Sequence, residues 1–523
     1  MKKIFTVLAC LVLGIQLAVL NQFAQAQKEI KLVADEDVTE QGMSSDISGD
    51  SVIVGSHRGN YAKVFVRDGT KWEEQETLIP QADGRVGWSV AISGDIAVLG
   101  APNANAGAEK SGTAFVFVRS GRKWQQRAKL VGDNPEAADN FGESVSVDRN
   151  TVIIGVPRDD DAGRDAGSAY VYFRDGVAWK KQAKLIPADL GGSDGFGDAV
   201  FIRGNTAIIG ATGHTHGGKR FTGAAYVFVR NGNRWVRQAK LTVADGGKGD
   251  RFGTSIGFIG KTIVVGAPFY DSENAKDVGA AYVFVPDGNR WKLQAKLRPE
   301  DSGKGHNVGA GVATTGNIVI VGAPGYDRPE RGSGAAYSFV REDGTWTQTA
   351  KVTPDHGARD LNFGYVVSMS ENTAAISSHS KPFLVHDGWP NGDGHAAYVY
   401  NTIESFDTPP FAVEPFGLLL RTFGQIKRAA LFQNFPNPFN PETWIPYQLA
   451  TDAPVMLRIH NVRGQLVREL DLGRHEAGSY LSRETAAYWD GKDQSGERAS
   501  SGLYFYTLRA ASFQATRKML ILK

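Results

Sequence analysis

The 523-residue chain has a single cysteine, little excess of either charge and, after its first 26 residues, no long apolar run. The cysteine, Cys10, lies within those 26 residues, so the rest of the chain has no disulfide, thiolate metal site or cysteine nucleophile. Lysine and arginine number 58 against 56 acidic residues, with no basic stripe, which argues against nucleic acid as a partner. No later apolar run reaches the ~20 residues that a membrane-spanning helix needs.

The first 26 residues have the layout of a secretory signal peptide. Lys2 and Lys3 precede an apolar run over residues 4–20, and residues 24–26 provide a small-x-small cleavage site. We therefore predict that residues 1–26 are removed and that the protein is secreted or displayed at the cell surface. Two alternatives stay open: an uncleaved membrane anchor, and a lipoprotein signal acylated at Cys10.

Glycine is abundant, with 62 residues, and much of it recurs at a fixed interval. A glycine preceded by an apolar or aromatic residue appears every 55 or 56 residues, and Gly42 is a weaker first copy. Each unit also carries a Gly-Ala-Pro-like segment, an Ala-Tyr-Val-Phe-like segment and, in six units, a tryptophan. Self-similarity at such a period indicates a repeat architecture. The recurring glycines are Gly87, Gly142, Gly197, Gly253, Gly309 and Gly364.

Each unit reads as four short strands rich in Val, Ile, Phe and Tyr and bounded by turn residues. Four-stranded units repeated seven times predict an all-β chain whose residues 27–401 form a seven-bladed β-propeller. The seventh unit lacks a fourth strand of its own. Residues 28–36 resemble the fourth strands of other units, so we predict that this N-terminal strand completes the last blade and leaves no free edge.

The Phe-Gly and Gly-Ala-Pro segments resemble FG-GAP repeats, the family that includes the propeller of integrin α-subunits. The resemblance implies an extracellular binding role. Integrin-type repeats often carry an Asp-rich calcium loop between the two segments, but here that connection is a short turn such as Gly260-Lys261. A turn of this length cannot supply the six or more oxygens that Ca²⁺ takes, so the family's calcium sites are not carried over.

After the repeats, residues 402–430 read as a linker and residues 431–523 as a small Ig-like β-sandwich. The dense prolines of residues 434–441 exclude a helix at its start. Together with the segments Trp489-Asp490-Gly491 and Ser501-Gly502-Leu503-Tyr504, this entry resembles the sorting domain of type IX secretion substrates, a FlgD-like Ig domain. The resemblance implies that an outer-membrane secretion machinery is a partner, and that the domain is either cleaved or kept as an anchor.

Few residues suggest chemistry, and we predict no catalytic residue and no cofactor. His214 and His216, alternate residues of one loop, could both reach a metal ion. Acidic groups in two equivalent loops could bind Ca²⁺ weakly, and in each case a solvated loop is the favoured interpretation. The acidic candidates are Asp159, Asp160, Asp161 and Asp165 in one loop, and Asp271, Glu273 and Asp277 in the other.

Other aspartates recur once per unit, and a residue repeated in this way is expected to hold a turn rather than to catalyse a reaction. One set follows the fourth strand of each unit, and a second set precedes the recurring Phe-Gly. The first set is Asp133, Asp189, Asp245, Asp301 and Asp355, and the second is Asp139, Asp194 and Asp250.

A fold alone does not define a function. We expect an exported, non-enzymatic binding or adhesion scaffold that recognises a protein or glycan through the loops after each Gly-Ala-Pro segment. These loops vary between units, whereas the strands do not. A secreted hydrolase or lyase acting on polysaccharide is the alternative, since paired carboxylates could come from different blades. A structural surface-layer component is a third possibility.

Overall fold

The computed structural model describes residues 30–32, 44–69, 71–81, 84–288, 290–327, 331–354, 360–370, 373–378, 396–401, 429–432, 434, 442–476, 478–480, 486–511 and 513–521. All regular elements in these ranges are β-strands. The chain divides into two compact units, Met1–Phe411 and Ala412–Lys523. Within the described ranges no helix is long and apolar enough to cross a membrane.

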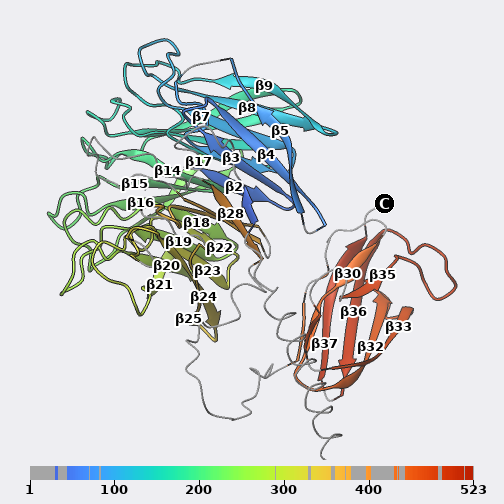
Figure 1. Ribbon diagram of the computed structural model, residues 1–523. Helices are drawn as coiled ribbons and strands as arrows, with labels where there is room; N and C mark the ends of the chain where they lie inside the picture. Colours follow the sequence, from blue (N-terminus) through green and yellow to red (C-terminus); the bar gives the residue numbers. More distant parts are fainter. Residues whose placement is uncertain are drawn as a thin grey trace, which may run out of the picture. The chain divides into compact units, whose positions relative to one another are not determined.

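The first unit is a β-propeller, and its described residues contain seven antiparallel four-stranded sheets, or blades. In blades 1 to 6 the strands follow the chain from the inside outward (Figure 1). Blade 1 is β2 (Ser45–Ser48), β3 (Ser51–Ser56), β4 (Tyr61–Asp68) and β5 (Lys71–Leu78). Blade 2 is β6 (Val90–Ser93), β7 (Ile96–Ala101), β8 (Thr113–Ser120) and β9 (Lys123–Leu130). Blade 3 is β10 (Ser144–Asp148), β11 (Thr151–Val156), β12 (Ser168–Asp175) and β13 (Ala178–Leu185).

The next three blades repeat this order. Blade 4 is β14 (Phe196–Arg203), β15 (Thr206–Ala211), β16 (Ala224–Asn231) and β17 (Arg234–Leu241). Blade 5 is β18 (Ile256–Ile259), β19 (Thr262–Ala267), β20 (Ala280–Asp287) and β21 (Arg290–Leu297). Blade 6 is β22 (Val312–Thr314), β23 (Ile318–Ala323), β24 (Ala335–Glu342) and β25 (Thr345–Val352).

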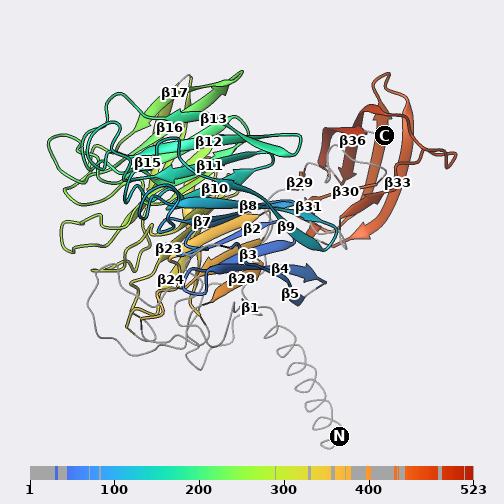
Figure 2. The same cartoon turned by 90° about the horizontal axis from the view of Figure 1, so that it is seen from above.

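Blade 7 joins the two ends of the repeat region. It consists of β26 (Val366–Ser370), β27 (Thr373–Ser377), β28 (Ala397–Asn401) and the N-terminal strand β1 (Ile30–Leu32). Ile30 pairs with Val399 and Leu32 with Ala397, so residues 30–32 supply the fourth strand that the seventh unit lacks. The rest of the predicted strand, residues 28–29 and 33–36, lies outside the described residues. β2, the first inner strand, packs against β26 and β27 of blade 7, and Figure 2 shows β28 next to β1.

The recurring Phe-Gly pairs are where neighbouring blades meet. Phe252 is fully buried and packs edge-on against Tyr282 and Phe284, with ring centroids 5.6 and 6.0 Å apart. The Gly-Ala-Pro glycine must be small, because a Cβ on Gly266 would lie 1.9 Å from the carbonyl oxygen of Gly309 in the next blade. The repeated glycine is thus a point of close backbone approach rather than a site of flexibility.

The outer strands are tied together by side chains from successive blades. The indole N–H of each of four tryptophans donates to a glutamine of the preceding blade, at 2.8 to 3.1 Å. These hydrogen bonds connect the outer strands of neighbouring blades. The pairs are Trp124–Gln75, Trp235–Gln182, Trp291–Gln238 and Trp346–Gln294.

The second unit has its own β-core. One sheet has the order β33 (Leu466–His475), β32 (Ala453–Asn461), β36 (Gly502–Ala510) and β37 (Phe513–Ile521). The others are β29 (Ala430–Leu431), β31 (Tyr447–Leu449) and β34 (Gly478–Tyr480), and the pair β30 (Thr443–Ile445) and β35 (Ala487–Trp489). Trp489, Tyr447 and Tyr506 are buried between them. The Tyr506 hydroxyl fixes the domain entry, since it donates to Phe432 O and accepts from Asn434 N.

Candidate ligand-binding site

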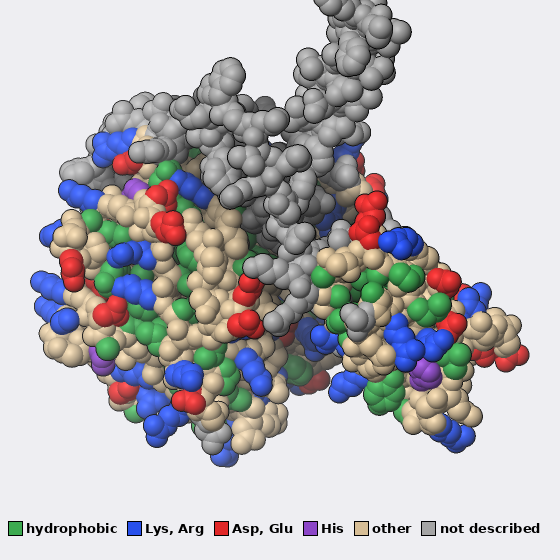
Figure 3. Space-filling model, turned by 90° about the horizontal axis from the view of Figure 1, so that it is seen from below, with side chains coloured by type: hydrophobic (Ala, Val, Ile, Leu, Met, Phe, Trp, Pro, Cys, Tyr) green, Lys and Arg blue, Asp and Glu red, His purple; other side chains and the backbone are tan. Residues whose placement is uncertain are grey.

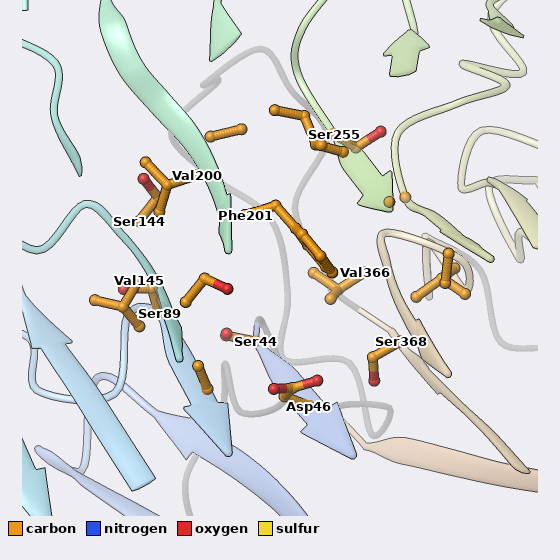
Figure 4. A pocket seen from close by; sticks show the side chains of 18 of the residues that line it. Ser44, Asp46, Ser89, Ser144, Val145, Val200, Phe201, Ser255, Val366 and Ser368 are labelled. Carbon is orange, nitrogen blue, oxygen red and sulfur yellow. The ribbon is translucent and has the colours of Figure 1, made fainter. Parts of the chain in front are cut away.

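The inner strands of all seven blades surround a cavity of about 510 Å³ (Figure 4). Because side chains alternate along a strand, successive residues of each inner strand differ in how far they are exposed to this cavity. In β10, for example, Val145 and Val147 are buried, whereas Ser144, Ser146 and Asp148 are half-buried. The volume lies within the range of small-molecule sites.

Several cavity-lining serines are occupied in holding the ring together. The hydroxyl groups of Ser89, Ser144 and Ser255 donate to a carbonyl of the next blade at 2.6 to 2.8 Å. Other serines accept from backbone N–H groups of the next blade, as Ser44 does from Val90 at 2.8 Å. These hydroxyl groups keep further acceptor capacity towards the cavity.

One end of the cavity is lined by residues that directly follow the recurring glycines. Trp88, Glu143, Asp198 and Tyr365 come after Gly87, Gly142, Gly197 and Gly364, and all four line the cavity. We call these four residues the channel mouth. They differ in every blade, whereas the glycine before them is constant. The sequence therefore contained a signal that we missed. The residue after the recurring glycine changes from unit to unit, although the glycine itself does not.

Glu143 is the central acid of the channel mouth. Its Oε1 accepts a hydrogen bond of 3.0 Å from the indole N–H of Trp88. Burial, and then the negative charge of Asp198, raise the pKa of Glu143 to about 7 against the smaller opposing effects of Trp88, Arg158 and Arg85. Glu143 is consequently shared between its protonated and ionised forms near neutral pH.

Asp198 stands in the neighbouring blade and shares this environment. It accepts a hydrogen bond from the Thr212 hydroxyl. Burial raises the pKa of Asp198 to about 6, while Thr212, Arg251 and Arg158 act in the opposite direction. Among the described residues neither Asp198 nor Glu143 makes an ion pair within 4 Å.

Three exposed arginines, Arg85, Arg158 and Arg251, belong to the surroundings of these carboxyl groups. The Arg85 guanidinium lies over the Trp88 ring, 5.2 Å from its centroid, and so orders the indole that contacts Glu143. Burial also raises the pKa of Tyr365 to about 12, and Glu143 adds to this shift. The Tyr365 phenol therefore keeps its proton and remains a donor at the channel mouth.

Further along the inner strands, an aromatic side chain projects into the cavity. Figure 4 shows Phe201 of β14 pointing towards the middle of the opening. The residues at the corresponding position of other blades are small, including Ala91, Gly257 and Ala313. Phe201 thus takes up space that the other blades leave open.

Asp46 occupies that same position in blade 1. Its carboxylate accepts from the N–H groups of Ile47 and Ile92, both at 2.9 Å. Burial raises the pKa of Asp46 to about 6 despite these bonds and the charge of Arg203. The cavity as a whole therefore disfavours fixed negative charge.

The structure separates the two histidines that the sequence put forward as metal ligands. His214 is buried, and its Nδ1 lies 2.7 Å from the Asp194 carboxylate. His216 is exposed, in a short hairpin contact with Lys219. His214 thus contacts Asp194 inside the protein, while His216 faces solvent.

The Asp-rich loop of blade 3 is neutralised by a lysine side chain of the same blade. Lys184 Nζ lies 2.6 Å from Asp159 and 2.5 Å from Asp161. Asp159 is buried and also accepts from the Ser168 hydroxyl at 2.6 Å, while Asp165 is paired at 3.5 Å with Arg164. The carboxylates proposed for Ca²⁺ are therefore engaged with basic and polar groups of the chain.

In the equivalent loop of blade 5, Asp271 accepts from the backbone N–H of Asp277 at 2.8 Å, and Glu273 is exposed. Among the described residues no group of three His, Cys, Asp or Glu side chains is arranged to hold a metal ion.

The repeated aspartates have two roles. Those before Phe-Gly accept from the backbone three residues earlier, which confirms the turn prediction for Asp139, Asp194 and Asp250. Those after the fourth strand form an ion pair with a lysine of the next blade, a contact that the turn prediction did not include. These ion pairs are Asp133–Lys181, Asp189–Lys240, Asp245–Lys296 and Asp301–Lys351, whereas Asp355 lies outside the described residues.

Fold and site together define a repeat protein, a β-propeller with a ligand-sized central cavity. FG-GAP repeats match residues 72–117, 124–172, 179–228, 235–284, 291–339 and 346–400, more than half of the chain, so the chain belongs to the FG-GAP repeat family. A FlgD Ig-like domain matches residues 442–514.

Comparisons at the level of whole proteins give only distant similarity. No curated protein matches the sequence. Of the solved structures, a chain in "Crystal Structure of Mitotic Checkpoint Complex" is 10% identical with a TM-score of 0.44, covering 71% of this chain and 93% of that one. Sqt1 of Saccharomyces cerevisiae is 12% identical with a TM-score of 0.39, covering 72% of this chain and 98% of that one.

Proposed function

We propose that this protein is an exported, non-enzymatic scaffold that binds a protein or glycan ligand through one face of its propeller. That face, called here the loop face, carries the loops after the Gly-Ala-Pro segments and the channel mouth. The two are adjacent, because Gly142 before Glu143 donates its N–H to Gly155 O, where such a loop begins.

The observation that carries the proposal is the difference between the two faces. On the opposite face the chain turns with only two residues between strands, as at Gly204-Asn205, in all but one of the described turns of blades 1 to 6. On the loop face the connections of blades 2 to 6 have 11 or 12 residues each and differ in sequence, and blade 1 has a shorter one, residues 57–60. Variation confined to one face of a constant scaffold is typical of a recognition surface.

Charge does not dominate the surface that Figure 3 shows. Basic and acidic side chains are interspersed there, and no large continuous area carries one sign. Such a surface favours neither a polyanion nor a polycation as the ligand.

Export and attachment are part of the same proposal. The N-terminal segment reads as a signal peptide, and the matched FlgD Ig-like domain resembles the sorting domains of secretion substrates. A chain lacking residues 431–523 should remain inside the producing cell envelope. Its appearance outside at the normal level would contradict the sorting role.

The test of binding is a screen of the full chain against arrays of glycans and surface proteins. Replacing residues 158–167 and 212–221 by short turns should abolish saturable binding. A matched control replaces Gly204-Asn205 on the opposite face and should bind normally. Loss of binding in the control, or full binding in the loop variant, would contradict the proposal.

A hydrolase or lyase acting on polysaccharide remains the second candidate function. The specific observation in its favour is the pair of carboxyl groups, Glu143 and Asp198, brought from neighbouring blades into one cavity. A protonated carboxylic acid near an ionised one is what glycoside hydrolysis requires. Turnover of any polysaccharide in the same screen, lost in Glu143→Gln, would replace the scaffold proposal by this one.

A further inference from the structure

We propose that the channel mouth binds the terminal residue of a neutral glycan, with Glu143 and Asp198 contacting its hydroxyl groups and Trp88 and Tyr365 forming its aromatic walls. The inference deepens the proposed function and rests on it: it names one ligand class and places it at one site on the loop face.

The first step is the chemistry of the walls. Carboxyl groups and serine hydroxyls supply hydrogen-bonding groups for sugar hydroxyls, and the cavity presents both. Aromatic rings offer apolar surface to the C–H face of a sugar ring, and Trp88 and Tyr365 line the same end. The cavity therefore offers both polar and apolar contacts, as the hydroxyl groups and C–H faces of a sugar ring require.

The second step is the presence of both acidic and basic groups around the site, which argues against an ionic ligand. Burial raises the pKa of Glu143 to about 7 and that of Asp198 to about 6, so near neutral pH Glu143 can donate as well as accept, whereas Asp198 mainly accepts. A cationic ligand would meet Arg85, Arg158 and Arg251 nearby, and an anionic ligand would meet the carboxyl groups. A neutral, hydroxyl-rich molecule is compatible with both the arginines and the carboxyl groups.

The third step is the shape of the site, which selects chain ends. The inner strands of seven blades surround the cavity. A glycan chain that lies across the loop face therefore cannot place a residue from the middle of the chain inside it. Phe201 projects into the cavity and narrows the route by which a chain could be threaded through (Figure 4). Only a terminal residue can therefore enter from the loop face.

The experiment measures affinity of the full chain for neutral linear oligosaccharides, as a series from disaccharide to hexasaccharide of each class on the array. If only the end residue is bound, molar affinity is constant along a series. Affinity that rises steadily with length would overturn the inference, since it requires contacts to internal residues.

Variants then place the site. Glu143→Ala and Trp88→Ala should each weaken oligosaccharide binding at least tenfold, whereas Trp88→Phe, which keeps a ring, should retain part of the affinity. The matched control is Glu136→Gln, an exposed acid of a loop-face connection, which should bind normally. Unchanged affinity in both channel-mouth alanine variants, with the folded state verified by thermal unfolding, would overturn the inference.

The failures of the two proposals are distinguishable. Glycan binding that is lost on loop replacement but kept in Glu143→Ala overturns the channel-mouth site and supports the loop face. Binding of proteins but of no oligosaccharide would likewise overturn the channel-mouth site and support the loop face. Binding of neither class overturns both.

Discussion

The acidic residues at the rim of the propeller and those at its channel mouth form a contrast. At the rim, Asp245 and Asp301 each bind a lysine of the next blade at 2.8 Å. At the mouth, Glu143 and Asp198 are adjacent carboxyl groups without such a partner among the described residues. The rim acids recur from blade to blade, and the mouth acids do not. In a repeat protein, recurrence therefore points to structure and departure from it points to function.

The largest effect is expected where a recurring residue is removed from the core. Phe252→Ala should lower the free energy of unfolding by about 3–5 kcal/mol, because it leaves a cavity between blades. Phe201→Ala is the matched control, since it deletes the same side chain from the half-buried channel position and should cost less than half as much. Denaturant unfolding measures both. Equal losses would break the contrast between recurring and non-recurring positions.

A smaller effect, of opposite sign, is expected at the channel mouth. The folded protein raises the pKa of Glu143 from 4.5 to about 7, so it binds this proton more strongly than the unfolded chain does. Stability linked to Glu143 is therefore greatest below pH 4.5 and falls as the pH rises through 7. Glu143→Gln should stabilise the protein by about 1–2 kcal/mol at pH 8, with little change at pH 4. Thermal unfolding at the two pH values checks this, and destabilisation at pH 8 would contradict it.

The smallest effect is expected at a rim ion pair. Burial alone would raise the pKa of Asp301, but the hydrogen bond and charge of Lys351 outweigh it and hold this pKa below its usual range. The pair's contribution is therefore present above the ordinary aspartate pKa and is lost as the pH falls below it. Because both side chains are partly exposed, a double-mutant cycle of Asp301→Asn and Lys351→Met should give about 0.5 kcal/mol. A coupling energy of zero would mean that the recurring pair is only a consequence of the repeat.

Most of the fold could be predicted because the same pattern of strands and turns recurs in every unit. The four short strands expected in each unit are observed, as in β18 to β21 of blade 5, and the N-terminal strand pairs with β28 as its resemblance to other fourth strands predicted. In the second unit the expected β-structure is present, and Pro446, which has no N–H to donate, separates β30 from β31.

The site could not be predicted in the same way. The loop acids stood out because they are clustered in sequence, yet Lys184 from a distant strand neutralises Asp159 and Asp161. Glu143 and Asp198 stand 55 residues apart in sequence. Only closure of the ring makes them neighbours and leaves them half-buried, and the resulting loss of solvation is the main cause of their raised pKa values.

The pairing of β1 with β28 also has a consequence in time. β1 is made first, but its partner follows more than 360 residues later. At synthesis rates of about 5–20 residues per second, β1 waits for roughly twenty seconds to over a minute before it can pair. Blade 7 is therefore the last to be completed, and any chain interrupted before residue 397 leaves a ring that cannot close. Only a chain that contains both β1 and β28 can therefore form the closed ring.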